Sequence, residues 1–526
     1  MSAVLRLYLR LTRRGIALLA LAIGAYVVVE AVSFIQTYPD QASRARVAAL
    51  GDQPAVRMLQ GIPHAVDTVG GFVVWDGGWF MQAIVGVWAI LTTSRLLRGE
   101  EESGRGELVG AGPLSGMQAA GLGLLTVLIG CAIAGVAVFS TIIWFSGDVF
   151  GSALFALGIF GFAAMMAAAT AVASQMFGVR RRVAAVGAGF LGVAFVLRMI
   201  ANSSDDRLWV NWLSVFGWMD RLRPFGDNNF GVVAVYVAAV GGLIALALFL
   251  RSRRDLAAAV LTPDTEPRSR LFLLQSPIGF AWRLTWGTLL AWALGLAAYS
   301  FFMGSLVKAM GEVLADDPAY DVYLEMLGLT RDDITKGMLA FMAVVLGLVV
   351  SLYAAWRIGA VRGEEDSERA EHLLTRPLTR GRWLGGHLLL ALASVIVLVL
   401  VSGTATWVGA AITDAGVSLG DAIAASANLL PVILLFGGLA VAMFGLAPRL
   451  TVGVPVGAVV VTYVLQIVGQ GLHFPGWVIG LSPFYHLALV PVADYALTQG
   501  LVMTVIGLVA TAVGWVAFHR RDLVGA

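Results

Sequence analysis

The 526-residue sequence has one cysteine, Cys131, and two lysines, Lys308 and Lys336. A single cysteine excludes a framework of disulfides within the chain and a cysteine-based metal site. A Walker A loop requires the dipeptide Gly-Lys, whereas the two lysines follow Val307 and Thr335. The sequence therefore holds no P-loop with which the chain itself would bind and hydrolyse a nucleotide.

Patterns typical of enzymes are missing or lie in the wrong context. The six histidines form no HExxH motif, so a metal site has no support. Residues 187–192 match the dinucleotide fingerprint, but they lie in an apolar run without a preceding strand, where small residues favour close helix packing. Residues 416–420 match the nucleophile elbow without its strand-to-helix context. We predict no catalytic residue, no metal and no cofactor in this chain, and no nucleic-acid partner.

Charged residues are also scarce. They make up 13% of the chain, against about a quarter in a soluble domain, and hydrophobic residues make up 59%. Apolar runs of about 20 residues, which can cross a bilayer core of roughly 30 Å as helices, occur about six times in each half. The expected fold is an all-α polytopic membrane protein with about 12 transmembrane helices in two six-helix repeats. The expected spans are 15–36, 79–97, 117–145, 150–178, 183–201, 231–250, 286–307, 338–359, 383–411, 422–447, 452–471 and 496–518.

Arginines and carboxylates occupy different connections between these spans. Arginines cluster within 6–14, 180–182, 251–254, 376–382 and 520–521, whereas the connection 308–337 is acidic. By the positive-inside rule, both termini are expected in the cytoplasm and the protein in the plasma (inner) membrane, without a cleavable signal peptide. Arg6, Arg10, Arg13 and Arg14 share one helix face, which predicts an interfacial elbow helix before the first span or, alternatively, a simple basic anchor.

One charged stretch occurs twice in this apolar chain. Residues 98–116 and 362–380 match at 9 of 19 positions, beginning with Arg-Gly-Glu-Glu, where composition alone gives about one or two matches. Two shorter repeats accompany it: Met-Phe-Gly at 176–178 and 443–445, and Arg-Arg-Asp-Leu at 253–256 and 520–523. We therefore divide the chain into halves at 1–256 and 277–526, joined by a cytoplasmic linker at 257–276.

Each copy of the charged stretch predicts a short helix. A glutamate stands four residues before an arginine, Glu101 before Arg105 and Glu365 before Arg369, which is the favourable order for a helical ion pair. A proline later in each stretch would end or bend the helix. We expect an acidic-faced cytoplasmic helix after the second span of each half; the alternative is a solvated charged turn.

Few charged residues lie within the expected spans, where each costs around 3 kcal/mol at the bilayer centre. Glu30 lies toward the outer end of the first span, and Arg198 toward that of the fifth, where the second half has Gln466. These residues either line a substrate path or snorkel to the external surface. We predict no carboxylate near the middle of the membrane, where proton-coupled transporters normally need one.

At the Arg-Gly-Glu-Glu loops the chain resembles the type II ABC exporter permeases, and more narrowly the fused twelve-span actinobacterial permeases described as tetronasin-type exporters of polyketide antibiotics. The resemblance covers the whole chain and implies two copies of a separate ABC ATPase subunit, which binds ATP and Mg. The residues implied to contact or brace the ATPase are Glu100, Glu101, Arg105, Glu107, Glu364, Glu365, Arg369 and Glu371. The resemblance also implies a drug path between the halves, with spans two and five as its main lining and Trp88, Phe195, Tyr353 and Tyr463 as candidates.

These features lead to one preferred function and two alternatives. We expect the lipid-embedded membrane subunit of an ATP-driven exporter, which moves hydrophobic or amphipathic small molecules such as antibiotics and drugs out of the cell. A secondary transporter driven by an ion gradient is the first alternative, and an intramembrane carboxylate pair would favour it. A membrane-embedded lipid enzyme is the second, and a clustered nucleophile would favour it. The chain alone is not expected to be an enzyme.

Overall fold

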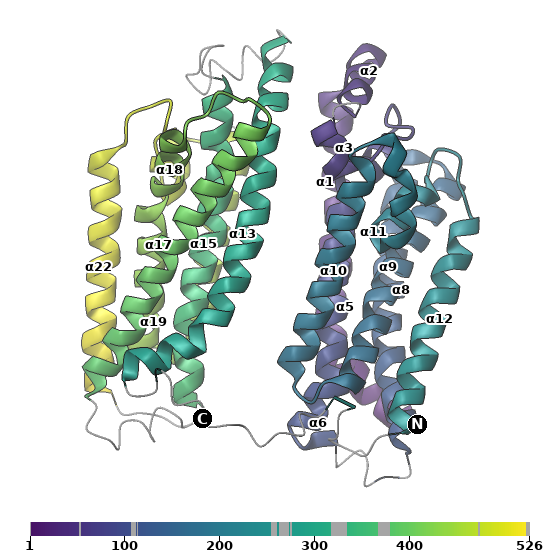
Figure 1. The fold of residues 1–526 in the computed structure, drawn as a ribbon, viewed down its shortest axis with the longest axis horizontal. Helices are drawn as coiled ribbons and strands as arrows, with labels where there is room; N and C mark the ends of the chain where they lie inside the picture. The colour runs from purple at the N-terminus through teal and green to yellow at the C-terminus, as the bar shows by residue number, and fades with distance from the viewer. Residues whose placement is uncertain are drawn as a thin grey trace. The chain divides into compact units, whose positions relative to one another are not determined.

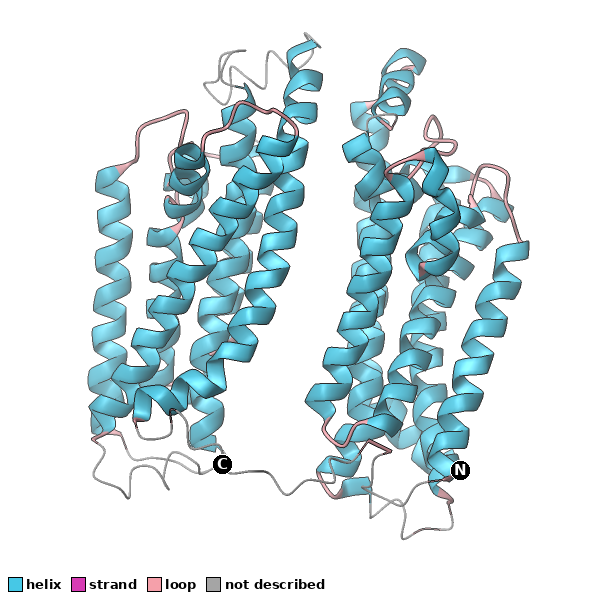
Figure 2. Ribbon diagram, in the orientation of Figure 1, coloured by secondary structure: helices cyan, strands magenta, loops and turns pink. Residues whose placement is uncertain are grey.

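The computed structural model describes residues 2–51, 54–106, 112, 114–253, 260–261, 273, 276–316, 334–366, 379–471 and 474–521. The chain forms two compact units, Met1–Arg268 and Ser269–Ala526, which divide within the expected linker. The described residues form helices and connections and contain no strand (Figure 2). The all-α fold class expected from the sequence is therefore confirmed.

Eleven helices in the described part of the chain are long and apolar enough to cross a membrane. Five lie at Ala3–Thr37, Val69–Glu102, Gly116–Ser146, Val149–Met176 and Arg180–Asn202, and six lie at Gly231–Ser252, Ile278–Lys308, Ile334–Glu365, Arg380–Ile412, Leu419–Leu446 and Leu497–Arg520. The twelfth expected span falls on helix α20 (Gly453–Gly471), in which only the shorter stretch Gly453–Gln466 is apolar. About twelve spans were expected, and eleven meet both the length and the hydropathy that a crossing needs.

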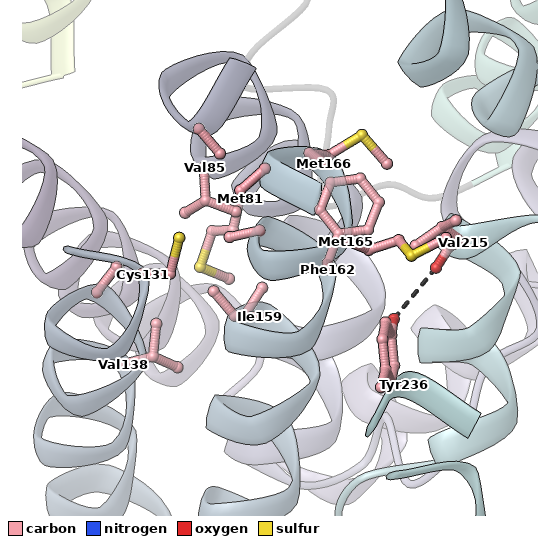
Figure 3. Packing of buried hydrophobic residues seen from close by; sticks show 14 of the residues in the cluster. Met81, Val85, Cys131, Val138, Ile159, Phe162, Met165, Met166, Val215 and Tyr236 are labelled. Carbon is pink, nitrogen blue, oxygen red and sulfur yellow. Dashed lines mark hydrogen bonds between the residues drawn. The ribbon is translucent and has the colours of Figure 1, made fainter. Parts of the chain in front are cut away.

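The first unit is built around helix α9 (Val149–Met176), which contacts α5 (Gly78–Ser94), α8 (Gly116–Ser146), α10 (Arg180–Asn202) and α12 (Gly231–Ser252). Small residues allow these helices to pack closely. At Gly161, for example, α12 is so near that a Cβ would meet the ring of Tyr236. Figure 3 shows the core between these helices, with Met81, Val85, Cys131, Val138, Ile159, Phe162, Met165 and Met166 labelled. In the same view Tyr236 donates its hydroxyl to the carbonyl of Val215 at 3.2 Å.

The second unit contains α13 (Pro277–Asp316), α15 (Ile334–Asp366), α17 (Arg380–Ile412), α18 (Leu419–Ala427), α19 (Leu430–Leu446), α20 and α22 (Leu497–Arg520), most of them labelled in Figure 1. Helices α19 and α22 approach at their backbones, because a Cβ on Gly438 would meet the carbonyl of Gly507 and one on Gly514 would meet that of Val441. Glycine is therefore required for this spacing.

The elbow helix expected before the first span is not a separate element. Helix α1 (Ser2–Thr37) runs unbroken through that segment, and α13 does the same in the second unit. The amphipathic character that predicted the elbow is nevertheless present, since Arg6 and Arg10 are exposed whereas Tyr8 and Thr12 are buried. In Figure 1 the first turns of α13 run across the lower end of the unit before the helix rises along it.

The connections that follow α1 and α10 are partly helical. The connection after α1 holds α2 (Gln41–Leu50) and α3 (Pro54–Gln60), and α10 is followed by the 3-10 helix η3 (Asp205–Leu213) and by α11 (Val215–Leu222). The aromatic residues Trp209 and Trp212 are exposed there, as interfacial tryptophans commonly are.

Candidate functional site

The first charged stretch begins within a helix. Helix α5 continues without a break through the π-helical turn η2 (Arg95–Gly99) and α6 (Glu100–Glu102). A π-helical turn adds a residue to the helix repeat and often marks a functional site. Here Arg98 and Glu100 are buried against the unit. The second copy likewise begins within α15, where Glu364 and Glu365 are buried.

Glu101 is held by two arginines, which we call the first triad (Arg98, Glu101 and Arg251). Nη1 of Arg98 lies 2.8 Å from Oε2 of Glu101, and Nη2 of Arg251 lies 3.6 Å from Oε1. The exposed fractions of the Arg98, Glu101 and Arg251 side chains are 4%, 11% and 7%, so solvent screens these charges weakly. Arg98 also donates its Nε–H to the carbonyl of Gly178 at 2.8 Å.

Glu365 is held in the same way by the second triad (Arg362, Glu365 and Arg521). Nη2 of Arg521 donates to Oε2 of Glu365 at 2.7 Å, and Nη1 of Arg362 lies 3.3 Å from the same oxygen. The Glu365 side chain is only 2% exposed. The guanidinium of Arg521 also lies over the rings of Phe444, at 5.3 Å, and Phe518, at 5.4 Å.

Each triad therefore joins three features that the sequence repeats: Arg-Gly-Glu-Glu, Met-Phe-Gly and the basic end of the last helix. These motifs are visible in the sequence, but Arg251 and Arg521 were not predicted as partners of the glutamates. The available signal was that arginines recur where each half ends, at 251–254 and 520–521. It did not identify the glutamates as partners, because a contact between residues about 150 positions apart leaves no local sequence pattern. Two guanidinium groups on one carboxylate leave each triad with a net positive charge.

The prediction of an ion pair between Glu101 and Arg105 is wrong. Helix α6 ends at Glu102, and Gly104 has a left-handed φ of 74°, which turns the chain back and takes Arg105 off the helix. Arg105 consequently donates to both carboxylate oxygens of Glu100, at 2.9 and 3.2 Å. The Glu102 carboxylate accepts from the backbone N–H of Arg180 at 3.0 Å and so caps α10. Glu107, Arg369 and Glu371 lie outside the described residues.

Glu364 ends a chain of buried polar groups that links three helices of the second unit. Its Oε2 lies 3.7 Å from Nε2 of His387, whose Nδ1 is 3.3 Å from Nη2 of Arg357. Arg357 donates to Oγ1 of Thr285 at 2.7 Å. At the repeat offset of 264, the first unit has Thr93 and Gly123 in place of Arg357 and His387, so the two units differ in this chain.

Arg198 is buried rather than directed to the surface. Its Nε and Nη2 donate to the two carboxylate oxygens of Asp220 at 2.8 and 2.9 Å, and Nη2 also donates to the carbonyl of Gln60 at 2.7 Å. The guanidinium therefore finds its partners inside the unit rather than in solvent. Arg198 ties α10 to the segments between spans. Nearby, burial and the charge of Arg223 lower the pKa of His64.

Glu30 belongs to a cluster that sequence analysis did not foresee. Gln60 donates its Nε2–H to Asp76, and a Cβ on Gly77, the next residue, would meet the side chains of both Tyr26 and Glu30. Asp76 was missed because the second span was expected to begin at 79, whereas the helix includes Asp76 in the π-helical turn η1 (Val73–Gly77).

The other candidates for a substrate path are aromatic side chains that pack within their units. In the first unit, Trp88 packs on Gly130 of α8, and Phe195 contacts Trp79 and Phe216. Both side chains pack against the hydrophobic core of the first unit.

In the second unit, Tyr353 is fully buried beside Trp292, and Tyr463 meets Phe484 edge-on at 5.5 Å. Trp292 and Tyr299 line an apolar hollow of about 380 Å³ between α13 and α15. Gln466 has a buried Oε1 for which the described residues provide no hydrogen-bond donor.

Comparison with known proteins gives two findings. The profile of one family, described as "Multidrug efflux system permease Rv1217c, C-terminal domain", matches residues 1–250 and 274–519. The "Multidrug efflux system permease protein Rv1217c" of Mycobacterium tuberculosis (strain ATCC 25618 / H37Rv) is 33% identical to this chain over 530 residues. That alignment covers 99% of this chain and 94% of the relative.

Proposed function

The chain belongs to the family of the multidrug efflux system permease Rv1217c, and we propose from this membership that it is the membrane-spanning permease of a multidrug efflux system. The observation that carries the proposal is the match along nearly the whole length of both proteins. Eleven helices among the residues that the structure describes can cross a membrane, which supports the proposal because a permease needs a multi-pass bundle.

The proposed energy source is ATP hydrolysed by a separate ABC ATPase, which would hold ATP and Mg and bind as two copies. Two features support this part. The sequence has no Gly-Lys dipeptide and hence no P-loop, and the charged stretch that resembles an ATPase-docking loop occurs once in each unit. The proposed cargo is hydrophobic or amphipathic small molecules, which leave the cell across the plasma membrane. The arginine-rich ends of the last helix in each unit, at 251–254 and 520–521, would face the cytoplasm.

One observation favours a second candidate, a transporter driven by an ion gradient. Glu30 and Asp76 both lie within membrane-length helices of the first unit, and Glu30 packs beside Gly77, the neighbour of Asp76. Both residues are near the outer ends of their helices rather than at the centres. Arg-Leu-Thr recurs at 10–12 and 283–285, and Arg-Gly-Glu-Glu recurs at 98–101 and 362–365; these offsets make Met303 and Ala340 the corresponding residues of the second half. ATP-driven export therefore remains the preferred function.

Inside-out membrane vesicles can distinguish these functions. Vesicles that contain the permease with an ABC ATPase should accumulate a fluorescent amphipathic dye when ATP and Mg are added, and a protonophore should not prevent it. Dye accumulation that follows an imposed pH gradient without ATP, and that disappears in the variant Glu30→Gln with Asp76→Asn, would support the gradient-driven transporter. Vesicles that move no amphipathic dye with either energy source would contradict efflux itself.

A further inference from the structure

Two buried triads occupy corresponding places in the two units. In each one, a carboxylate at the end of the second span is bound by an arginine three residues before it and by an arginine at the end of the last helix. A third helix end also takes part, since Gly178 accepts from Arg98 and Phe444 lies under Arg521. Each triad thus joins three helix ends.

The arginine of the last helix differs in position between the units. When the two Arg-Arg-Asp-Leu motifs are aligned, Arg251 corresponds to Phe518, and Arg521 corresponds to Arg254. The two arginines that bind the glutamates are therefore offset by three residues, close to one helical turn. In the second unit Phe518 instead packs on the guanidinium of Arg521. The contact between carboxylate and guanidinium is common to both units although the position of the arginine is not.

The triads also determine which part of the charged stretch is accessible. Glu101 points into the first unit, whereas residues 102–105 are exposed, and the side chain of Arg105 is 62% exposed. A partner that docks on this end would touch the residues after Glu101 and leave Glu101 itself inside. Glu101 and Glu365 therefore fit a role behind the docking surface, between that surface and the last helix.

We propose, on the basis of the proposed function, that Arg251 and Arg521 are positioning residues for coupling. Through Glu101 and Glu365 they fasten the end of the second span to the end of the last helix in each unit. A displacement of the charged stretch by the ATPase then moves both helices together. A guanidinium suits this role because it binds a carboxylate in a fixed geometry, unlike the single flexible ammonium of lysine.

The test uses the full chain purified with its ATPase and reconstituted in proteoliposomes. The variants are Arg251→Gln and Arg521→Gln, and their matched controls are Arg253→Gln and Arg520→Gln, which alter exposed arginines at the same two helix ends. Transport per ATP hydrolysed should fall at least about fivefold in the first two and stay near wild type in the controls. Copurification of the ATPase and basal ATP hydrolysis should be unchanged.

Further variants separate positioning from folding. Arg251→Lys should recover part of the transport per ATP hydrolysed that Arg251→Gln loses, because lysine restores the positive charge without the planar geometry of a guanidinium. Glu101→Gln combined with Arg251→Gln should lose no more than either single variant, since both remove the same contact. A folded Arg251→Gln permease that keeps the wild-type transport per ATP would overturn the proposal, as would loss of ATPase binding. If wild-type proteoliposomes show no ATP-driven transport, the proposed function itself fails.

Discussion

At the scale of single residues, buried arginines organise this apolar chain. Arg98, Arg198, Arg251 and Arg357 are each less than a tenth exposed, and each binds a partner from another segment. Burying such a charge is costly, and removing one partner leaves the other charge uncompensated. Arg198 is the clearest example, because its Nε and Nη2 both donate to one carboxylate, that of Asp220.

We expect Arg198→Gln to lower the free energy of unfolding by about 2–4 kcal/mol, because it leaves the carboxylate of Asp220, whose side chain is only 15% exposed, without its cation. Chemical denaturation of the purified protein in detergent measures this change. Adding Asp220→Asn should recover part of the loss, since the double variant holds no unpaired charge. Arg207→Gln, at an exposed position nearby, should change the stability by about 0.5 kcal/mol or less. An equal loss in the single and double variants would show that the ion pair is not the cause.

At the scale of elements, apolar runs predicted most helices to within a few residues. The expected span 117–145 is α8 (Gly116–Ser146), and 383–411 lies within α17 (Arg380–Ile412). Such runs locate a helix because only a helix satisfies its own backbone in a bilayer. They do not locate its ends, because a polar turn can continue the helix. The second span therefore includes Asp76 and Glu100, and α1 absorbs the expected elbow helix.

The candidate site was predictable only in part for the same reason. Repetition identified the charged stretches, and composition identified Glu101 and Glu365 as unusual in their setting. Their partners could not be identified, because Arg251 and Arg521 lie about 150 residues further along the chain and only the packing of the helices brings them together. The expected partner Arg105 was wrong because the left-handed turn at Gly104 ended the helix before it.

Helix spacing in the second unit can be tested at a glycine. We expect Gly514→Ala to destabilise the protein by about 1–3 kcal/mol, because its Cβ would meet the backbone of Val441 and push α22 away from α19. Gly457→Ala on α20 is the control, since no atom lies within 4 Å of its Cβ position, and it should stabilise by roughly 0.5–1 kcal/mol. Thermal unfolding in detergent measures both, and equal shifts would contradict close packing at Gly514.

At the scale of the whole molecule, two related units carry the same triad in unequal environments. The Glu365 side chain is 2% exposed and lies 2.7 Å from its last-helix arginine, whereas Glu101 is 11% exposed and lies 3.6 Å from its own. The second unit also has the buried chain through His387, whose counterpart in the first unit is Gly123. We therefore expect the two units to contribute unequally to coupling.

Neutral replacements test this inequality better than charge reversal, which would bring three guanidinium or ammonium groups together in a buried site. We expect Glu365→Gln to lower transport per ATP hydrolysed more than Glu101→Gln does, because its contacts are shorter and less exposed to water. If both units act in one transport cycle, the combined variant should lie within about twofold of Glu365→Gln alone, since interactions that serve the same step are not additive. Transport and ATP hydrolysis measured in the same proteoliposomes give this ratio. A combined loss equal to the product of the two single losses would instead show that each unit couples to its ATPase independently.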